Sequence, residues 1–252
     1  MYPSIWIFDT YSIFLFLGVL SCMLLLVKYF KKNKLDRKYM YDILLLTCGS
    51  VIIGILSAAL FQFIFDSFKE NSTNKAFSMT FFGGLLGGVV IFIIGYWTVI
   101  KKRYPKSDFI NDILIIAPAC ITIAHGLGRI GCFFAGCCYG IQTDSILGVK
   151  FPHLPYNVYP TQLFEAIFLL LLTVVLFLLA YKNKFKYTMC IYLSSYGIFR
   201  FLIEYIRGDD RGAFIPGISP SQMFSIAAIT ISIVLFIFLK KKSTQKCATA
   251  VE

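Results

Sequence analysis

Apolar runs long enough to span a lipid bilayer recur along the whole of this 252-residue chain. A transmembrane helix needs about 20 consecutive, mostly apolar residues, and 58% of the sequence is hydrophobic while only 15% is charged. That composition is too apolar for a soluble domain. The candidate spans lie at about 11–30, 41–65, 77–100, 109–127, 161–181, 187–206 and 221–239. The sequence therefore predicts an all-α integral membrane protein whose seven helices form a single polytopic domain over residues 1–252.

The basic residues are distributed unevenly among the connections between these spans. Of the 24 Lys and Arg, 17 lie in residues 28–38, 101–106, 182–186 and 240–246, which are alternate connections plus the C-terminal segment. Because short loops rich in Lys and Arg stay on the cytoplasmic side, we predict that the N-terminus lies outside and the C-terminus inside. The net charge of +11 then reflects topology, and the partners it favours are anionic membrane lipids rather than nucleic acid.

Charged side chains also occur inside or at the rim of the apolar runs. A charge at the centre of a membrane helix is unfavourable by about 2.5–3.5 kcal/mol on the insertion scale, so arginines at membrane depth are expected to face an anion. Phospholipid phosphate is the abundant anion there. Tyr196, Arg200, Glu204 and Arg207 follow one another at spacings that place them within about 80° on one helix face, and Arg129 lies in another span.

A glycine-rich segment, residues 125–140, surrounds Arg129. Its five glycines are poor helix formers, and non-helical backbone at membrane depth is tolerated where it lines a site. We therefore expect a non-helical wall of a binding site here. His125 precedes Arg129 by four residues, so it is a candidate to take or relay a proton. The alternatives are a hydrogen-bonded buried histidine and an arginine that extends to the interface.

Three cysteines of this segment, Cys132, Cys137 and Cys138, cluster in the sequence. Free or packed thiols, a disulfide, a catalytic thiol and a metal site all remain open. The spacing differs from the C-x2–4-C pairs typical of structural zinc, so the sequence favours the other three possibilities and predicts no metal ion.

Two further elements carry weaker signals. Gly83 and Gly84 belong to overlapping small-xxx-small pairs, which let a second helix approach closely or leave bare backbone for a lipid. Pro160 and Pro220 each stand at an expected helix start. Gln162 and Glu165 follow the first of them on a shared face near the outer leaflet, and Ser219 with Gln222 has the spacing of a capping box.

Four blocks resemble motifs of the prolipoprotein diacylglyceryl transferase family. They are Gly128-Arg129-Ile130-Gly131-Cys132-Phe133 with Gly136 and Gly140, Pro160-Thr161-Gln162-Leu163-Phe164-Glu165, Tyr196-Gly197-x-x-Arg200-Phe201-x-x-Glu204-x-x-Arg207, and Ser219-x-x-Gln222. The glycine-rich third span is similar too. The blocks occur in the family's order from about residue 77 onward, and seven spans with the N-terminus outside is the family's topology.

The resemblance implies an enzyme of the bacterial plasma membrane that needs no cofactor. It would move the diacylglyceryl group of phosphatidylglycerol onto the lipobox cysteine of an exported preprotein. Arg129 and Arg200 would hold the phosphate together with Arg207, Gly83, Gly84 and Gln162, and Glu204 would hold an arginine. Tyr196 or His125 would handle the thiol proton.

The chain departs from the family pattern at three positions. Phe82 replaces a histidine that precedes the glycines of the third span, Cys132 replaces the usual asparagine, and Cys137 replaces the usual glutamate. Two alternatives therefore stay open beside the expected activity. One is a divergent paralogue that uses the same lipid with another acceptor, and the other is a phospholipid-binding or transport protein without chemistry.

Overall fold

The computed structural model describes residues 4–5, 8–67, 76–183, 185–208 and 218–248. Within these ranges seven helices are long and apolar enough to cross a membrane, which confirms the predicted fold class. They are α1 (Thr10–Lys32), α2 (Arg37–Ser67), α3 (Ala76–Gly95), α5 (Ala117–Ala135), α6 (Thr161–Asn183), α7 (Thr188–Ile203) and α8 (Pro220–Ala248). Short turns extend α3 and precede α5: the π-helical η1 (Tyr96–Ile100), α4 (Lys101–Arg103) and the π-helical η2 (Phe109–Leu114).

The helices group into two compact units, one formed by Phe30–Asp108 and the other by Met1–Tyr29 with Phe109–Glu252. In the first unit α2 and α3 pack through small residues. A Cβ added at Gly84 would lie 3.1 Å from the Gly54 carbonyl oxygen, and the Ser57 hydroxyl donates to the Gly83 carbonyl at 3.0 Å. Gly83 and Gly84 therefore serve close helix packing, and a lipid contact at these glycines stays a prediction.

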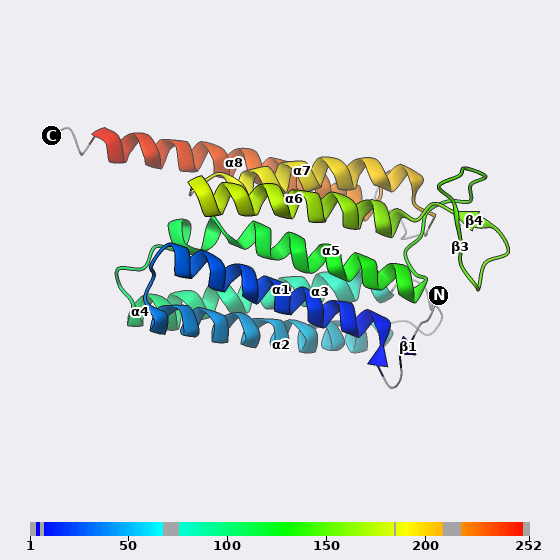
Figure 1. The fold of residues 1–252 in the computed structure, drawn as a ribbon, viewed down its shortest axis with the longest axis horizontal. Helices are drawn as coiled ribbons and strands as arrows, with labels where there is room; N and C mark the ends of the chain where they lie inside the picture. The colour runs from blue at the N-terminus through cyan, green and yellow to red at the C-terminus, as the bar shows by residue number, and fades with distance from the viewer. Residues whose placement is uncertain (1–3, 6–7, 68–75, 184, 209–217, 249–252) are drawn as a thin grey trace. The chain divides into compact units, whose positions relative to one another are not determined.

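In the second unit, helices α5, α6, α7 and α8 run side by side, and α1 packs on α5 (Figure 1). A Cβ added at Gly18 of α1 would lie 3.0 Å from the Ala124 carbonyl oxygen, so these two backbones meet closely. Phe168 and Phe199 stack between α6 and α7 with ring centroids 4.1 Å apart. Two short antiparallel pairs complete the described structure: β1 (Ser4–Ile5) with β2 (Phe8–Asp9), and β3 (Val149–Lys150) with β4 (Asn157–Val158).

The glycine-rich segment is helical for most of its length, so the expectation of a non-helical wall over residues 125–140 is wrong. Helix α5 continues to Ala135, and the chain leaves it at Gly136 in a left-handed conformation with φ 70°. Two of its helical glycines lie where neighbours come close, Gly126 against Leu169 and Leu170 and Gly131 against Tyr11 and Phe14, whereas Gly128 has no neighbour within 4 Å. The loss of about 1 kcal/mol per glycine is offset because close packing and complete backbone hydrogen bonding are favoured at membrane depth.

The predicted stripe of charge on one helix face is also interrupted. Helix α7 ends at Ile203, Glu204 opens the 3-10 turn η3 (Glu204–Ile206), and Arg207 is extended with φ −79° and ψ 142°. Only Tyr196 and Arg200 of the stripe lie on the helix itself.

The capping box predicted at the start of the last span is confirmed. The Ser219 N–H donates to Gln222 Oε1 at 3.0 Å, and the Gln222 N–H donates to Ser219 Oγ at 3.2 Å.

Candidate functional site

Glu165 lies one turn inside α6 and is fully buried. Its carboxylate faces α5 and α7. Arg129 Nε lies 3.0 Å from Oε2, His125 Nε2 lies 3.6 Å from Oε1, and the Tyr196 hydroxyl donates to Oε1 at 2.7 Å. A buried carboxylate persists only when it is paired and hydrogen-bonded. This carboxylate therefore joins three predicted site residues from two other helices.

Arg200 lies near the end of α7 with 6% of its surface exposed. Its Nη2 lies 2.8 Å from Glu204 Oε2 and donates to Ser221 Oγ, also at 2.8 Å. Its Nη1 is buried and has no hydrogen-bond partner among the described residues. Buried guanidinium nitrogens normally have partners, so one arm of a planar fork suited to phosphate oxygens is available for a ligand.

Arg207 is tied to the end of the glycine-rich segment. It forms an antiparallel bridge with Gly140, and the Ile141 N–H donates to the Ile206 carbonyl at 2.9 Å. A Cβ at Gly140 would lie 2.5 Å from that Ile206 carbonyl oxygen, so the bridge requires glycine. The bridge fixes the turn that follows α5 beside the turn that follows α7.

Side chains from the start of α6 hold the same turn. Gln162 Nε2 donates to the Cys137 carbonyl, and Thr161 Oγ1 donates to the Cys138 carbonyl at 3.0 Å. Gln162 is fully buried, and its Oε1 has no hydrogen-bond partner in the part of the chain that the structure describes. The predicted lipid contact of Gln162 thus coincides with a structural role at this turn.

The second unit contains most of the residues predicted for the site. They are His125, Arg129, Gln162, Tyr196, Arg200, Glu204 and Arg207. Gly83 and Gly84 belong to the other unit. Sequence reasoning underrated Glu165 and Ser221, which contact the arginines directly. The signal for Glu165 was present: an acidic residue within an apolar span marks a functional site by default.

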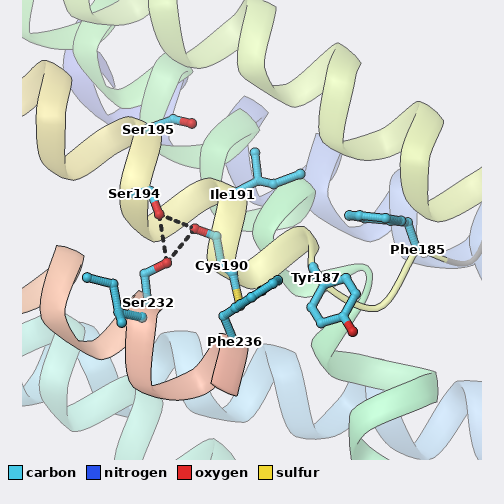
Figure 2. Close-up of a pocket in the computed structure, with 9 residues that line it drawn as sticks. Phe185, Tyr187, Cys190, Ile191, Ser194, Ser195, Ser232 and Phe236 are labelled. Atoms are coloured by element: carbon cyan, nitrogen blue, oxygen red, sulfur yellow. Dashed lines mark hydrogen bonds between the residues drawn. The ribbon is translucent and has the colours of Figure 1, made fainter. Parts of the chain in front are cut away.

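A separate pocket of about 430 Å³ lies between α7 and α8, toward the opposite end of α7 from Arg200 (Figure 2). The Ser194 and Ser232 hydroxyl oxygens lie 2.7 Å apart and each lies 2.8 Å from the Cys190 carbonyl oxygen, so their two hydrogens are shared among these three oxygens. Its lining residues carry no charge, and these hydroxyls satisfy one another. The pocket therefore does not suit a phosphate.

Comparison with known proteins matches the sequence of this chain to one family. The model of the prolipoprotein diacylglyceryl transferase family matches residues 5–238. The chain belongs to the prolipoprotein diacylglyceryl transferase family. The family predicted from the four sequence motifs is confirmed, and the protein is a multi-pass membrane protein of a transferase family.

Several relatives carry the name phosphatidylglycerol–prolipoprotein diacylglyceryl transferase. One from Clostridium tetani is 31% identical over 239 residues, which cover 90% of this chain and 91% of the relative. A second, from Clostridium perfringens, bears that name with the number 2 and is 33% identical over 217 residues, covering 71% of this chain and 83% of the relative. A third, from Dehalococcoides mccartyi, is 31% identical over 249 residues, covering 93% of this chain and 90% of the relative.

Proposed function

We propose that the protein transfers the diacylglyceryl group of phosphatidylglycerol to the lipobox cysteine of exported preproteins at the bacterial plasma membrane. In this reaction a sulfur–carbon bond forms as the bond between the glyceryl carbon and a phosphate oxygen breaks. The products are a thioether and glycerol 1-phosphate, and the thiol proton passes to a base. The names of the relatives support both substrates.

The observation that carries the proposal is the buried Nη1 of Arg200, which lacks a hydrogen-bond partner among the described residues. Glu204 and Ser221 hold Nη2 of the same guanidinium, so the arginine is oriented before a ligand arrives. A preorganised cation stabilises the charge that develops on a departing phosphate. Arg129, held by Glu165, supplies a second cation.

His125 is the proposed acceptor of the thiol proton. The hydroxyl hydrogen of Tyr196 is already donated to Glu165, whereas the imidazole has a ring nitrogen suited to general-base work. Glu165 Oε1 lies 3.6 Å from Nε2 of His125, where its negative charge stabilises the imidazolium that forms, as the carboxylate of a catalytic triad does. Tyr196 then orients Glu165.

Turnover by the purified protein tests the proposal. The protein is reconstituted into phosphatidylglycerol vesicles with a lipobox peptide, and glycerol 1-phosphate and lipidated peptide are measured together. We expect both products with the lipobox peptide and neither with a peptide in which serine replaces the cysteine. Phosphatidylglycerol turnover with a different acceptor only would favour the divergent paralogue, and lipid binding without turnover would favour a binding or transport protein.

We also propose that the N-terminus faces outside and the C-terminus inside, which the placement of basic residues supports. A reporter that is active only in the cytoplasm is fused after Lys106, Lys186, Asn74 or Asp144. We expect activity at the two lysines and none at Asn74 or Asp144. The opposite result at any two sites would refute this orientation.

A further inference from the structure

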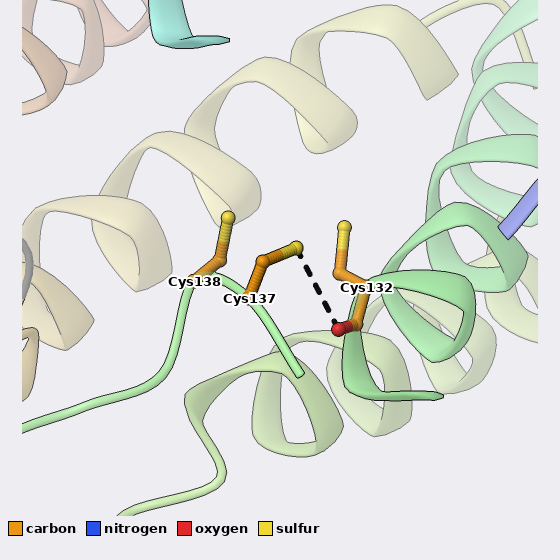
Figure 3. A group of neighbouring side chains, drawn as sticks. All are labelled: Cys132, Cys137 and Cys138. Atoms are coloured by element: carbon orange, nitrogen blue, oxygen red, sulfur yellow. Dashed lines mark hydrogen bonds between the residues drawn. The ribbon is translucent and has the colours of Figure 1, made fainter. Parts of the chain in front are cut away.

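Three thiols converge at the end of α5. Cys132 lies in the last turn of the helix, and Cys137 and Cys138 lie in the turn that follows it. Their sulfur atoms all lie within 4.8 Å of one another, and Figure 3 shows them gathered between the helix end and the turn. All three are free thiols in the structure. The unusual spacing in the sequence is thus compatible with one compact donor set.

The backbone is shaped to bring these sulfurs together. Gly136 and Cys138 both adopt left-handed conformations, with φ 70° and 63°. Glycine accepts this conformation readily, but cysteine is strained in it, and such strain concentrates at functional sites. The carbonyls of Cys137 and Cys138 are held by Gln162 and Thr161, so the strained turn is fixed from outside.

The dimensions suit a tetrahedral metal ion. Zinc binds thiolate sulfur at about 2.3 Å, which places two sulfurs of a tetrahedral site about 3.8 Å apart. Because the sulfurs lie within 4.8 Å of one another, side-chain movements of about 1 Å are enough to bring them to this separation. Cys132 is buried, while Cys137 and Cys138 are partly exposed, which leaves a path for an ion to enter.

The local charges also favour thiolates around a cation. The positive charges of Arg207 and Arg129 act on the Cys138 sulfur. Three thiolates with Zn²⁺ carry a net charge of −1, which these arginines offset. The ion itself would lie near the carbonyl end of α5, where a helix favours positive charge.

We propose that Cys132, Cys137 and Cys138 bind one zinc ion as thiolates. Each thiol releases its proton on binding. Because zinc in proteins is four-coordinate, three thiolates leave one position for water or for a thiol that enters the site. Soft thiolate ligands select zinc over magnesium or calcium. A disulfide would use only two of the three thiols, whereas a metal site uses them all. The proposal does not depend on the transferase activity.

The metal content of the purified, full-length protein tests this proposal. We expect about one zinc per chain in the unmodified protein after dialysis with zinc, and none above background when Cys132, Cys137 and Cys138 are each changed to serine. Cys48→Ser, which removes an exposed thiol on α2, is the matched control and should keep the ion. Cobalt in place of zinc should give thiolate-to-cobalt charge-transfer absorption in the control and not in the triple variant.

A second measurement needs no variant and covers the case in which the triple variant does not fold. Membranes that contain the unmodified protein are treated with a thiol-alkylating reagent before and after a strong chelator. We expect Cys132, Cys137 and Cys138 to become alkylated only after the chelator, and zinc to restore their protection. Protection that is lost only with a reductant would identify a disulfide and overturn the proposal. Equal alkylation with and without chelator, or a metal content unchanged in a folded triple variant, would also overturn it.

Discussion

Changing Glu165 to glutamine removes a fully buried charge that faces Arg129 at 3.0 Å and accepts the Tyr196 hydroxyl at 2.7 Å. Breaking a buried ion pair from one side is unfavourable by about 3–5 kcal/mol, because the other charge stays buried without its partner. The hydrogen bond from Tyr196 becomes a neutral one and loses about 1 kcal/mol. Together these losses lower the ratio of folded to unfolded protein by about 10³–10⁴-fold.

Reversible denaturant unfolding in detergent measures this change in the free energy of unfolding. Asp42→Asn is the matched control, because Asp42 pairs with Arg103 at 2.8 Å but the arginine side chain is 59% exposed. We expect a loss there of less than about 1 kcal/mol.

A double-mutant cycle with Arg129→Gln isolates the pair itself. The double variant should lose less stability than the sum of the two single variants, by roughly 2–3 kcal/mol. If Glu165→Gln is no more destabilising than Asp42→Asn, or if the two changes are additive, Glu165 does not compensate Arg129 and the argument for a carboxylate at the centre of the site fails.

Three other changes test separate parts of the site and the fold. Arg200→Lys keeps the charge but loses the planar fork. The variant should therefore lose most phosphatidylglycerol-dependent turnover while inserting normally into the membrane. Wild-type turnover would argue against a role of Arg200 in binding the phosphate. His125→Asn should lower turnover by about 10²-fold or more, the usual scale for a general base, while Phe82→His is tolerated. If the His125→Asn variant keeps near-wild-type turnover and the Tyr196→Phe variant has none, Tyr196 is the proton acceptor. Gly84→Leu should lower the free energy of unfolding by about 1–3 kcal/mol through overpacking, since the added Cβ would already lie 3.0 Å from the Ala58 Cβ; an unchanged denaturation midpoint would contradict the close packing of α2 and α3.

The sequence predicted the parts of the fold that depend on local pattern. Hydrophobic length alone located all seven helices, because a bilayer requires long apolar runs. The Ser219 and Gln222 capping box also followed from spacing alone, since its hydrogen bonds lie within four residues. These features need no knowledge of distant contacts.

Features set by tertiary packing could not be predicted in this way. Helix α5 continues through Gly126 because Leu169 and Leu170 of another helix lie against that glycine, and glycine propensity carries no information about such a neighbour. The end of α7 at Ile203 depends on the bridge between Arg207 and Gly140. The sequence placed Glu165 only near the start of a helix, because its ion pair with Arg129 of α5 depends on how the two helices pack.

The cluster of three cysteines is likewise set by tertiary contacts and not by a local sequence pattern. Their spacing argued against a metal site and left free thiols, a disulfide and a catalytic thiol open. Convergence of the sulfurs depends on the positive φ of Cys138 and on the hydrogen bonds from Thr161 and Gln162. Neither the strained conformation nor the contacts across more than 20 residues can be read from a local pattern.

Complementation tests the proposed transferase activity most directly. The chain is expressed in bacteria depleted of their own diacylglyceryl transferase, and a reporter preprotein with a lipobox is analysed by mass spectrometry. We expect the reporter cysteine to gain a diacylglyceryl group, and we expect Arg200→Ala, inserted at the same level, not to restore this modification. An unmodified reporter despite normal insertion of the unmodified chain, with rescue by a relative such as the Clostridium tetani protein under the same conditions, would contradict the proposed function.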